Sequence, residues 1–327
     1  MKKTAVVTGA NGQDGSHLCE LLLEKGYRVF ATIRNGSDVR RSTLGQAARN
    51  ESLTVLPGDV YDWRFAEGLI ASARPDEVYN LAAVSSVADS WKAPSAAMAV
   101  NTVGAARIFQ AVMQHTPKAR VFQASSSEMF GEATEPRQDE FTMLDPTNPY
   151  GASKAAAHQL AGVLRRGKEM FIACGILYNH EGPRRGDQFV TRKITRTAVA
   201  IAAGRATELR LGNLDAPRDW GYAPEYVEAM WRTLQHGEPD DFVIGTGVTH
   251  TVREFVAAAF RAVGIADWER FVVVDPAFFR PLDAYTLCAD PTRAEQELGW
   301  KATTQFDELV RKMVEADAEL IGFQLPG

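Results

Sequence analysis

The first half of the chain alternates short apolar runs with longer segments in which apolar residues recur at helical spacing. Runs rich in β-branched residues predict strands at residues 4–8, 28–33, 53–56, 78–81, 121–124 and 171–177. The segments between them predict helices at 17–25, 64–73, 95–115 and 152–165. This alternation indicates right-handed βαβ units, and therefore an α/β fold with a doubly wound parallel sheet covered by helices on both faces.

After about residue 178 the pattern changes to loops rich in glycine, proline and arginine, between helices predicted at 190–203, 224–235, 252–263 and 306–320. Thr251 and Glu254 have the spacing of a capping box, which predicts a helix start there. We therefore expect two regions, residues 1–178 and 179–327, the second being a smaller mixed α/β region. Some of its segments, about 241–264, are expected to return to the first region.

Composition narrows the possible partners. The 327 residues are 45% hydrophobic and carry a net charge of -5 with no strongly basic segment, so we expect no binding of nucleic acid or of an anionic membrane. Three scattered cysteines, Cys19, Cys174 and Cys288, fit neither a disulfide framework nor a zinc site, and we expect no metal. No apolar run approaches the roughly 18 residues of a membrane span. A cytoplasmic location is therefore expected.

A glycine-rich loop, TGANGQDG at residues 8–15, follows the first predicted strand and opens the first predicted helix. In this context Gly9, Gly12 and Gly15 permit a tight turn, a close backbone approach to a pyrophosphate and close packing of helix on strand. The loop therefore predicts a dinucleotide site and a Rossmann-type domain in residues 1–178.

The stretch TGANG resembles the extended short-chain dehydrogenase/reductase family. In that family an acid at the end of the second strand holds the ribose 2′-hydroxyl of NAD, whereas this chain has Arg34 after Ala31, Thr32 and Ile33. We therefore expect NADP. The cofactor-binding residues that the resemblance implies are Gly9, Asn11, Gly12, Gln13, Asp14, Gly15, Arg34, Asp59, Val60, Leu81, Ala82, Ala83, Tyr150, Lys154, Leu177, Asn179, His180 and Arg185.

The reacting groups are predicted from two motifs. Tyr150 and Lys154 are four residues apart, on one face of a predicted helix, and follow a strand that ends in serines. The resemblance implies that Lys154 holds the nicotinamide ribose and lowers the pKa of Tyr150, while Ser126 binds the substrate hydroxyl that Tyr150 deprotonates. The pKa of a phenol must fall by about three units for the group to act as a base near neutrality, which requires roughly 4 kcal/mol of preferential stabilisation of the phenolate. Glu128 is surplus to a simple oxidation, but a carboxylate there can take the proton α to the new ketone and so permit loss of water.

Four later blocks, beginning ILYNHEGPRRG, LGNLDAPRDWGY, DFVIGTGVTHT and FFRPLDAYTLC, resemble successive blocks of the GDP-mannose 4,6-dehydratase family over nearly the whole chain. The resemblance implies a catalytic set of Ser126, Glu128, Tyr150 and Lys154. It also implies substrate contacts at Ser85, Ser126, Glu128, Asn179, Val190, Lys193, Leu211, Gly212, Arg218, Arg280 and Asp283. Lys193, Arg218 and Arg280 would supply the positive charge that a pyrophosphate requires. The stretch at Arg40, Arg41 and Ser42 resembles a loop that reaches a neighbouring subunit, which implies a homodimer or homotetramer.

The expected reaction is therefore dehydration of GDP-mannose to GDP-4-keto-6-deoxymannose. Other readings remain open at this point, because the stretch VSSVADSW at residues 84–91 departs from the family's usual sequence. The substrate could be another nucleoside diphosphate hexose or a GDP-heptose, and the chain could be a related 4-keto-sugar reductase, epimerase or decarboxylase. A non-catalytic NADP-sensing or scaffold protein is a further alternative, against which the intact Ser126, Tyr150 and Lys154 argue.

Overall fold

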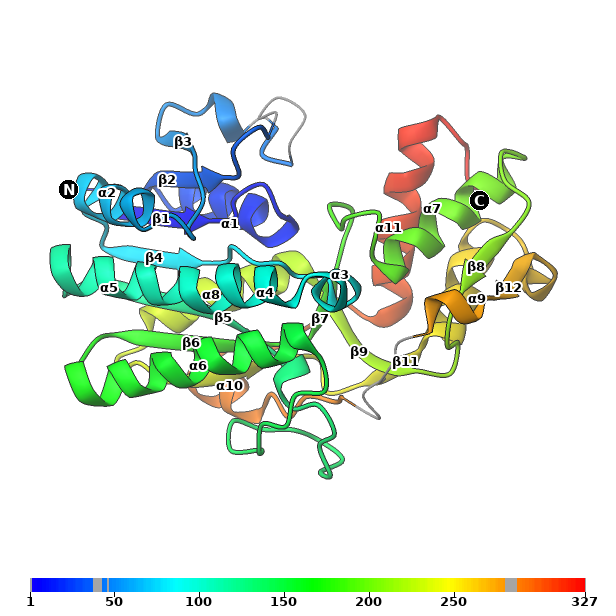
Figure 1. The fold of residues 1–327 in the computed structure, drawn as a ribbon. Coiled ribbons are helices and arrows are strands. Elements are labelled where there is room, and N and C mark those ends of the chain that lie inside the picture. The colour runs from blue at the N-terminus through cyan, green and yellow to red at the C-terminus, as the bar shows by residue number, and fades with distance from the viewer. Residues whose placement is uncertain (1, 38–42, 46, 280–286, 327) are drawn as a thin grey trace.

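The computed structural model describes residues 2–37, 43–45, 47–279 and 287–326. Its first region is built on a seven-stranded sheet in the order β10-β6-β5-β4-β1-β2-β3, with every pairing parallel (Figure 1). The strands are β1 (Thr4–Thr8), β2 (Arg28–Ile33), β3 (Leu53–Pro57), β4 (Glu77–Asn80), β5 (Arg120–Ser126), β6 (Ile172–Leu177) and β10 (Asp241–Ile244). The strand order reverses at the β1/β4 pair, and a ligand crevice is expected outside the carboxyl ends of the strands at such a point.

Helices cover both faces of this sheet, as predicted. One face packs against α2 (Trp63–Ala73), α5 (Ala105–His115) and α6 (Pro149–Lys168), and the other against α1 (Gln13–Glu24), α8 (Ala223–Gln235) and α10 (Thr292–Glu297). Ile70 and Phe109 are fully buried on the first face, and Leu18 and Leu22 on the second. Each such side chain contributes roughly 1.5–3 kcal/mol through burial, so the two apolar layers hold the strand ends in register.

The predicted strands and helices are confirmed to within a few residues, with one difference of type. The segment predicted as a single helix at 95–115 is α4 (Pro94–Ala97), a π-helical stretch η3 (Met98–Gly104) and then α5. Within the π-helical stretch, Asn101 accepts a hydrogen bond from the Val84 N–H at 2.8 Å and donates one to Ser153 Oγ at 2.8 Å. This π-helical stretch thus ties the loop after β4 to α6. Such stretches are frequent at functional sites.

The segment Pro94–His115 is also the one described helix long and apolar enough, by length and composition, to cross a membrane. Within it, α5 buries Ile108, Phe109 and Val112 against the sheet. A helix that packs against a sheet can be equally long and apolar, so length and composition alone carry little weight for a membrane role.

The second region has its own core, formed by α7 (Val190–Ala202), α9 (Val252–Ala262) and α11 (Phe306–Ile321). Two small sheets join it, one of β7 (Asn179–Glu181), β9 (Pro217–Tyr222) and β11 (Thr249–Thr251), the other of β8 (Leu209–Leu211) and β12 (Val272–Val274). The capping box is confirmed, because the Thr251 side chain accepts from the Glu254 N–H and the Glu254 carboxylate accepts from the Thr251 N–H.

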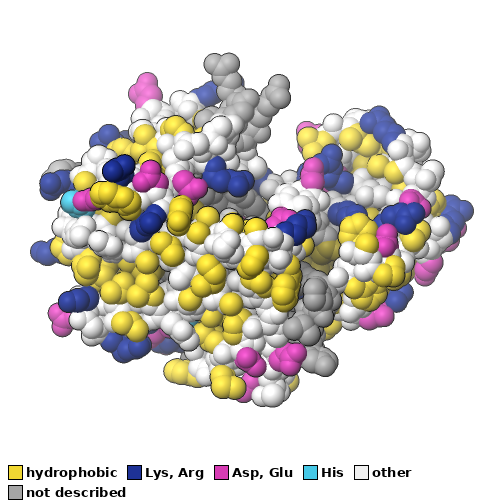
Figure 2. Space-filling view, viewed as in Figure 1, with side chains coloured by type: hydrophobic (Ala, Val, Ile, Leu, Met, Phe, Trp, Pro, Cys, Tyr) yellow, Lys and Arg dark blue, Asp and Glu magenta, His cyan; other side chains and the backbone are white. Residues whose placement is uncertain are grey.

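The segment 241–264 divides between the two regions. Strand β10 lies beside β6 at the edge of the large sheet, whereas α9 packs with α7 and α11 in the second core. Helix α8, which also follows residue 178, packs against α1 on the large sheet. The boundary at residue 178 stays a prediction. Figure 2 shows the surface hollowed between the two regions.

Candidate active site

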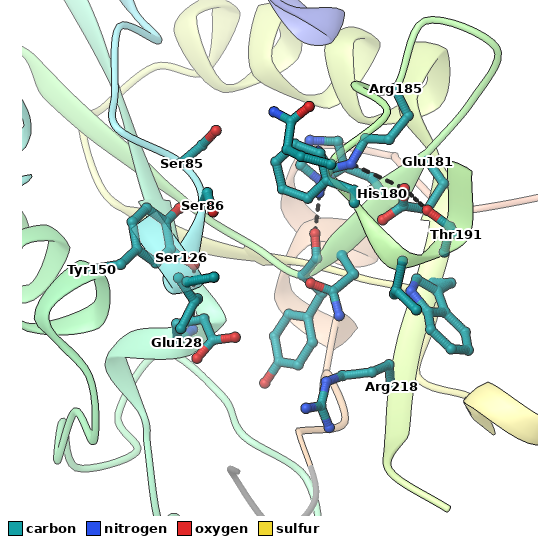
Figure 3. A pocket seen from close by; sticks show the side chains of 18 of the residues that line it. Ser85, Ser86, Ser126, Glu128, Tyr150, His180, Glu181, Arg185, Thr191 and Arg218 are labelled. Atoms are coloured by element: carbon teal, nitrogen blue, oxygen red, sulfur yellow. Dashed lines mark hydrogen bonds and ion pairs between the residues drawn. The ribbon is translucent and has the colours of Figure 1, made fainter. Parts of the chain in front are cut away.

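A cavity of about 510 Å³ lies at the carboxyl ends of β5 and β6 and extends between the two regions. Most residues expected at the site line it. They are Asp14, Leu81, Ala83, Ser85, Ser126, Glu128, Tyr150, Lys154, Leu177, Asn179, His180, Arg185, Val190, Lys193, Leu211, Gly212 and Arg218. Figure 3 shows Ser126, Glu128 and Tyr150 on one side of this cavity, with His180, Arg185 and Arg218 on the other.

The other expected residues lie outside the cavity wall. Gly9, Asn11, Gly12, Gln13 and Gly15 belong to the loop after β1 and the start of α1, and Arg34, Asp59, Val60 and Ala82 follow β2, β3 and β4 at the same edge of the sheet. Arg280 and Asp283 lie outside the described residues, as do residues 40–42.

The loop after β1 has the shape of a dinucleotide cradle. Gly9 has a positive φ of 69°, and a Cβ on Gly15 would lie only 2.4 Å from the carbonyl oxygen of Gly9. The loop is also joined to the segment after β2, because Asn11 donates to Ser37 Oγ at 3.3 Å and Thr43 donates to the Asn11 carbonyl at 2.8 Å. Exposed Arg34 therefore lies on a segment held against the glycine loop. Only glycines fit this close approach, which suits a pyrophosphate at the α1 N-terminus.

A buried ion pair joins the start of α1 to β7. Asp14 Oδ2 lies 2.9 Å from His180 Nε2, and His180 Nδ1 lies 2.7 Å from the Tyr178 carbonyl oxygen. Burial alone would raise the pKa of Asp14, but the charge of His180 and its hydrogen bond lower that pKa to about 2. Burial would likewise lower the pKa of His180, yet Asp14 raises it above the ordinary histidine value. A charged imidazole is therefore favoured beside the cofactor cradle.

Arg185 is held near this pair by a buried acid. Glu181 is 3% exposed, and its Oε2 lies 3.0 Å from Arg185 Nε and accepts a hydrogen bond from Thr191 at 2.6 Å. The Arg185 guanidinium also stacks 3.6 Å from the centroid of the Phe189 ring. These contacts fix the arginine at the cavity wall with its charge available to an anionic ligand.

Tyr150 and Lys154 lie on one face of α6, as predicted from their spacing. Lys154 is 4% exposed and its Nζ donates to the Ala124 carbonyl at 2.7 Å and lies 5.8 Å from the centroid of the Tyr150 ring. Burial lowers the pKa of Lys154 to about 8. Both groups therefore meet the end of β5, where Ser126 lies.

In the protein by itself, the pKa of the Tyr150 phenol is raised rather than lowered. Burial raises the pKa of Tyr150 to about 12, and Glu128 adds to this effect, while the hydrogen bond with Ser126 and the charge of Arg185 oppose it. To act as a base near neutrality the phenol must therefore fall by about five units, roughly 7 kcal/mol, rather than three. Additional positive charge beside Tyr150 is the physical requirement for this change.

Glu128 lies in a short 3₁₀ turn, η4 (Ser127–Met129), directly after β5. Ser126 Oγ accepts a hydrogen bond from the Glu128 N–H at 3.3 Å, and Asn148 Nδ2 donates to Glu128 Oε2 at 2.8 Å. The side chain is only 8% exposed and lines the cavity. Strand β5 continues two residues beyond its predicted end, so that Ser126 ends the strand and Glu128 is brought beside Tyr150.

The second region contributes positive charge to the opposite wall. Arg218, from β9, is 7% exposed and donates to the Pro217 carbonyl at 2.7 Å. Lys193, from α7, lies 3.7 Å from the centroid of the Phe278 ring, and burial lowers its pKa. Both residues line the cavity, which therefore presents basic groups opposite the Ser126, Glu128 and Tyr150 cluster.

Comparison with known proteins identifies the family. The model of the family described as GDP-mannose 4,6 dehydratase matches residues 6–313. The chain belongs to this family. A GDP-mannose 4,6 dehydratase of Arabidopsis thaliana is 44% identical over 98% of this chain and 91% of its own length, and a GDP-mannose 4,6-dehydratase of Vibrio cholerae is 39% identical over 97% and 94%.

Solved structures agree with the fold. A UDP-glucose 4-epimerase of Thermus thermophilus, in complex with NAD, superposes with a TM-score of 0.84 at 26% identity, covering 96% of this chain and 98% of its own. Together with the glycine cradle, this similarity supports a nicotinamide cofactor. Membership of the GDP-mannose 4,6-dehydratase family likewise supports a nucleotide-sugar substrate.

Several lining residues of this GDP-mannose 4,6-dehydratase family member were not predicted. Glu181, Thr191, Phe189 and Phe278 line the cavity, and Asn148 contacts Glu128 without lining it. Some sequence signals existed: Glu181 and Arg185 have i,i+4 spacing, and an asparagine before Pro149 is a typical helix N-cap. Neither signal by itself indicates a functional contact.

A cluster of ligand-type side chains lies behind β5. His158, Cys174 and Asp241 have potential ligand atoms within 4.8 Å of one another. Arg165 already places positive charge there, because its guanidinium donates to Asp241 at 2.5 Å and contacts Cys174 Sγ at 3.8 Å. The cluster is therefore satisfied by an arginine, and it carries no argument for a cation.

Proposed function

We propose that this protein is an NADP-dependent hydro-lyase that converts GDP-mannose to GDP-4-keto-6-deoxymannose and water, a step of deoxysugar biosynthesis. The observation that carries the proposal is the position of Glu128. It shares one wall of the cavity with Ser126 and Tyr150, so a second proton-transferring group lies beside the groups that an alcohol oxidation needs. Net NADPH consumption, rather than this carboxylate alone, would distinguish a reductase from a dehydratase.

The residues divide the chemistry between them. Ser126 binds the C4 hydroxyl, and Tyr150, as phenolate, takes its proton. Lys154 contributes positive charge near the phenol and holds the nicotinamide ribose. A bound NADP supplies the acceptor for the C4 hydride and later its donor to C6.

Glu128 performs the elimination. Its carboxylate takes the C5 proton, whose acidity comes from the adjacent C4 ketone, and passes a proton to the leaving C6 hydroxyl, which departs as water. A proton from the Tyr150 and Glu128 pair, exchangeable with solvent, then returns to C5. The proton taken from O4 balances the one that C5 needs, so the cycle has no net change in protons or in cofactor oxidation state.

Support for NADP comes from Arg34. This residue lies after β2 on a segment tied to the glycine loop, and residues 28–37 of that strand and segment include no acid. A guanidinium is suited to a 2′-phosphate, whereas an NAD site needs a carboxylate for the 2′-hydroxyl.

The substrate's pyrophosphate is assigned to the basic wall, with Lys193 and Arg218 as its partners and Arg280 as a third. Asn179, Val190, Leu211 and Gly212 are the further expected contacts, and Ser85 and Asp283 complete the set. A net charge of -5 makes such local positive charge necessary for a doubly anionic group.

The proposed assembly is a homodimer or homotetramer. Apolar side chains are exposed along the helices on one face of the sheet: Trp63, Met98, Val103, Met113 and Val163. Figure 2 shows apolar side chains gathered over this face. A continuous apolar surface of this kind is typical of a subunit interface. The proposed location is the cytoplasm, which suits three buried, free thiols.

The test is incubation with GDP-mannose and catalytic NADP in deuterated water, followed by mass spectrometry and NMR of the product. We expect loss of water, one solvent deuterium at C5, the C4 hydrogen at C6, and no net change in NADPH. Turnover of another nucleotide sugar in place of GDP-mannose would overturn the substrate. Stoichiometric NADPH consumption would instead indicate a reductase.

A further inference from the structure

The side chain that contacts the Glu128 carboxylate comes from the helix that carries Tyr150. Asn148 is the N-cap of α6 and is 6% exposed. Its Oδ1 accepts a hydrogen bond from the Gly151 N–H at 2.9 Å, and its Nδ2 donates to Glu128 Oε2 at 2.8 Å. One buried amide thus links the helix start to the carboxylate.

The cap alone does not require asparagine. Serine, threonine and aspartate cap helices about as well, because capping uses only a side-chain oxygen. Of these residues, only asparagine also offers an N–H₂ group at the far end, and here that group is used on Glu128. The amide can therefore cap the helix and also hold Glu128, and the second contact is not needed for capping.

A neutral donor on a buried carboxylate favours its charged form and fixes its orientation. Among the described residues, the charged or titratable groups that line the same cavity as Glu128 include Tyr150 and Lys154 from α6, and Arg218 and Arg185 across the cavity. Tyr150 becomes negative when it acts as a base, which disfavours a second negative charge nearby. A hydrogen-bond donor on Glu128 offsets this repulsion.

We infer that Asn148 is a positioning residue for the elimination half of the reaction: it holds the Glu128 carboxylate aimed at C5 while Tyr150 works beside it. The inference rests on the proposed function. It predicts that changing Asn148 separates dehydration from C4 oxidation, although both occur in one cavity.

The test compares Asn148→Asp and Asn148→Ser with the unchanged protein. Aspartate keeps the cap and the shape but replaces the donor with a carboxylate, and serine keeps a cap without reaching Glu128. Elimination is followed by dehydration of GDP-mannose, and by exchange of the C5 hydrogen of GDP-4-keto-6-deoxymannose in deuterated water. Oxidation is followed separately, by NADPH formed from GDP-6-deoxymannose, which has no C6 hydroxyl to lose.

We expect dehydration and C5 exchange to fall about 100-fold in Asn148→Asp and about 10-fold in Asn148→Ser, as for loss of hydrogen bonds to a charged group. Oxidation of GDP-6-deoxymannose by the variants should stay within about threefold of the rate of the unchanged protein, because the groups that perform it do not make the lost contact. A purely structural role would instead lower oxidation and elimination together.

Equal losses of oxidation and elimination in both variants, or unchanged elimination, would overturn the inference. If Asn148→Asp does not fold, the serine variant decides by the same ratio of elimination to oxidation. Failure of the unchanged protein to dehydrate GDP-mannose or to exchange C5 is a different result, because it contradicts the proposed function itself.

Discussion

Individual side chains decide which reaction this site can perform. In the proposed mechanism Ser126, Tyr150 and Lys154 serve the exchange of a hydride between an alcohol and a nicotinamide, and Glu128 adds a group for proton transfer at the next carbon. Because burial raises the pKa of Tyr150 to about 12, the phenol is neutral in the free protein at pH 7. Its activation therefore depends on the positive charge that ligands bring.

Glu128→Gln is expected to abolish dehydration, with a loss of about 10²–10⁴ in kcat, since the amide cannot take the C5 proton. NADPH binding should be unchanged, as measured by fluorescence titration. Glu132→Gln, an exposed residue of the adjacent loop, is the control and should dehydrate normally. Dehydration by Glu128→Gln at the unchanged rate would place the base elsewhere.

Cofactor choice is expected to depend on Arg34. Arg34→Ala should weaken NADPH binding about 10- to 100-fold, the effect of losing hydrogen bonds to a charged group, and should leave NADH binding nearly unchanged. Isothermal titration of both cofactors measures this. Arg28→Ala, at the opposite end of β2, is the matched control and should alter neither affinity. An equal loss for both cofactors would argue against a 2′-phosphate contact.

At the level of elements, the sequence predicted what local pattern determines. Parallel strands and amphipathic helices were placed correctly because their periodicity is local, and the glycine loop because its context is local. The π-helical stretch at Asn101, the β10 strand beside β6 and the Asn148 contact to Glu128 were not predicted in detail. Each depends on partners far away in the chain: 17 residues separate Asn101 from Val84, 20 separate Asn148 from Glu128, and 67 separate Asp241 of β10 from its partner Cys174 in β6.

The ion pair between Asp14 on α1 and His180 on β7 should make the free energy of unfolding depend on pH in the acid range. The depressed pKa of Asp14, about 2 against 3.8, means that its stabilisation is present above pH 4 and is lost as pH falls towards 2. Asp14→Asn should therefore lower the free energy of unfolding by about 2 kcal/mol near pH 5 and by less than about 0.5 kcal/mol near pH 2.

Urea denaturation of the cofactor-free protein across this pH range measures the difference. Asp215→Asn, which removes an exposed partner of Arg253, is the control and should cost little at any pH. A constant deficit for Asp14→Asn, independent of pH, would mean that the ion pair is not the cause. The test is confined to pH below about 6. The pKa of His180 is raised, so the stabilisation that His180 contributes is itself lost as pH rises.

The helices that cover one face of the large sheet leave apolar side chains exposed on the outside of the molecule. Met113 on α5 and Val163 on α6 are 37% and 56% exposed, and Met98 and Val103 on η3 are exposed as well. An interface there would join subunits through the helices of the large sheet (Figure 1). A stable interface needs about 800 Å² from each partner, which two or three helices can supply.

Val163→Glu and Met113→Glu are therefore expected to convert the assembly to smaller species, because a charge within an apolar interface must lose its water without a partner. Sedimentation velocity at micromolar concentration measures the change, and circular dichroism checks that the subunit stays folded. Leu320→Glu is the control, since Leu320 is 69% exposed on α11 in the second region. Dissociation by Leu320→Glu alone would assign the interface to the other region, and a monomeric unchanged protein would exclude the oligomer. If only the α5 and α6 variants dissociate, the apolar face of the sheet is the contact between subunits.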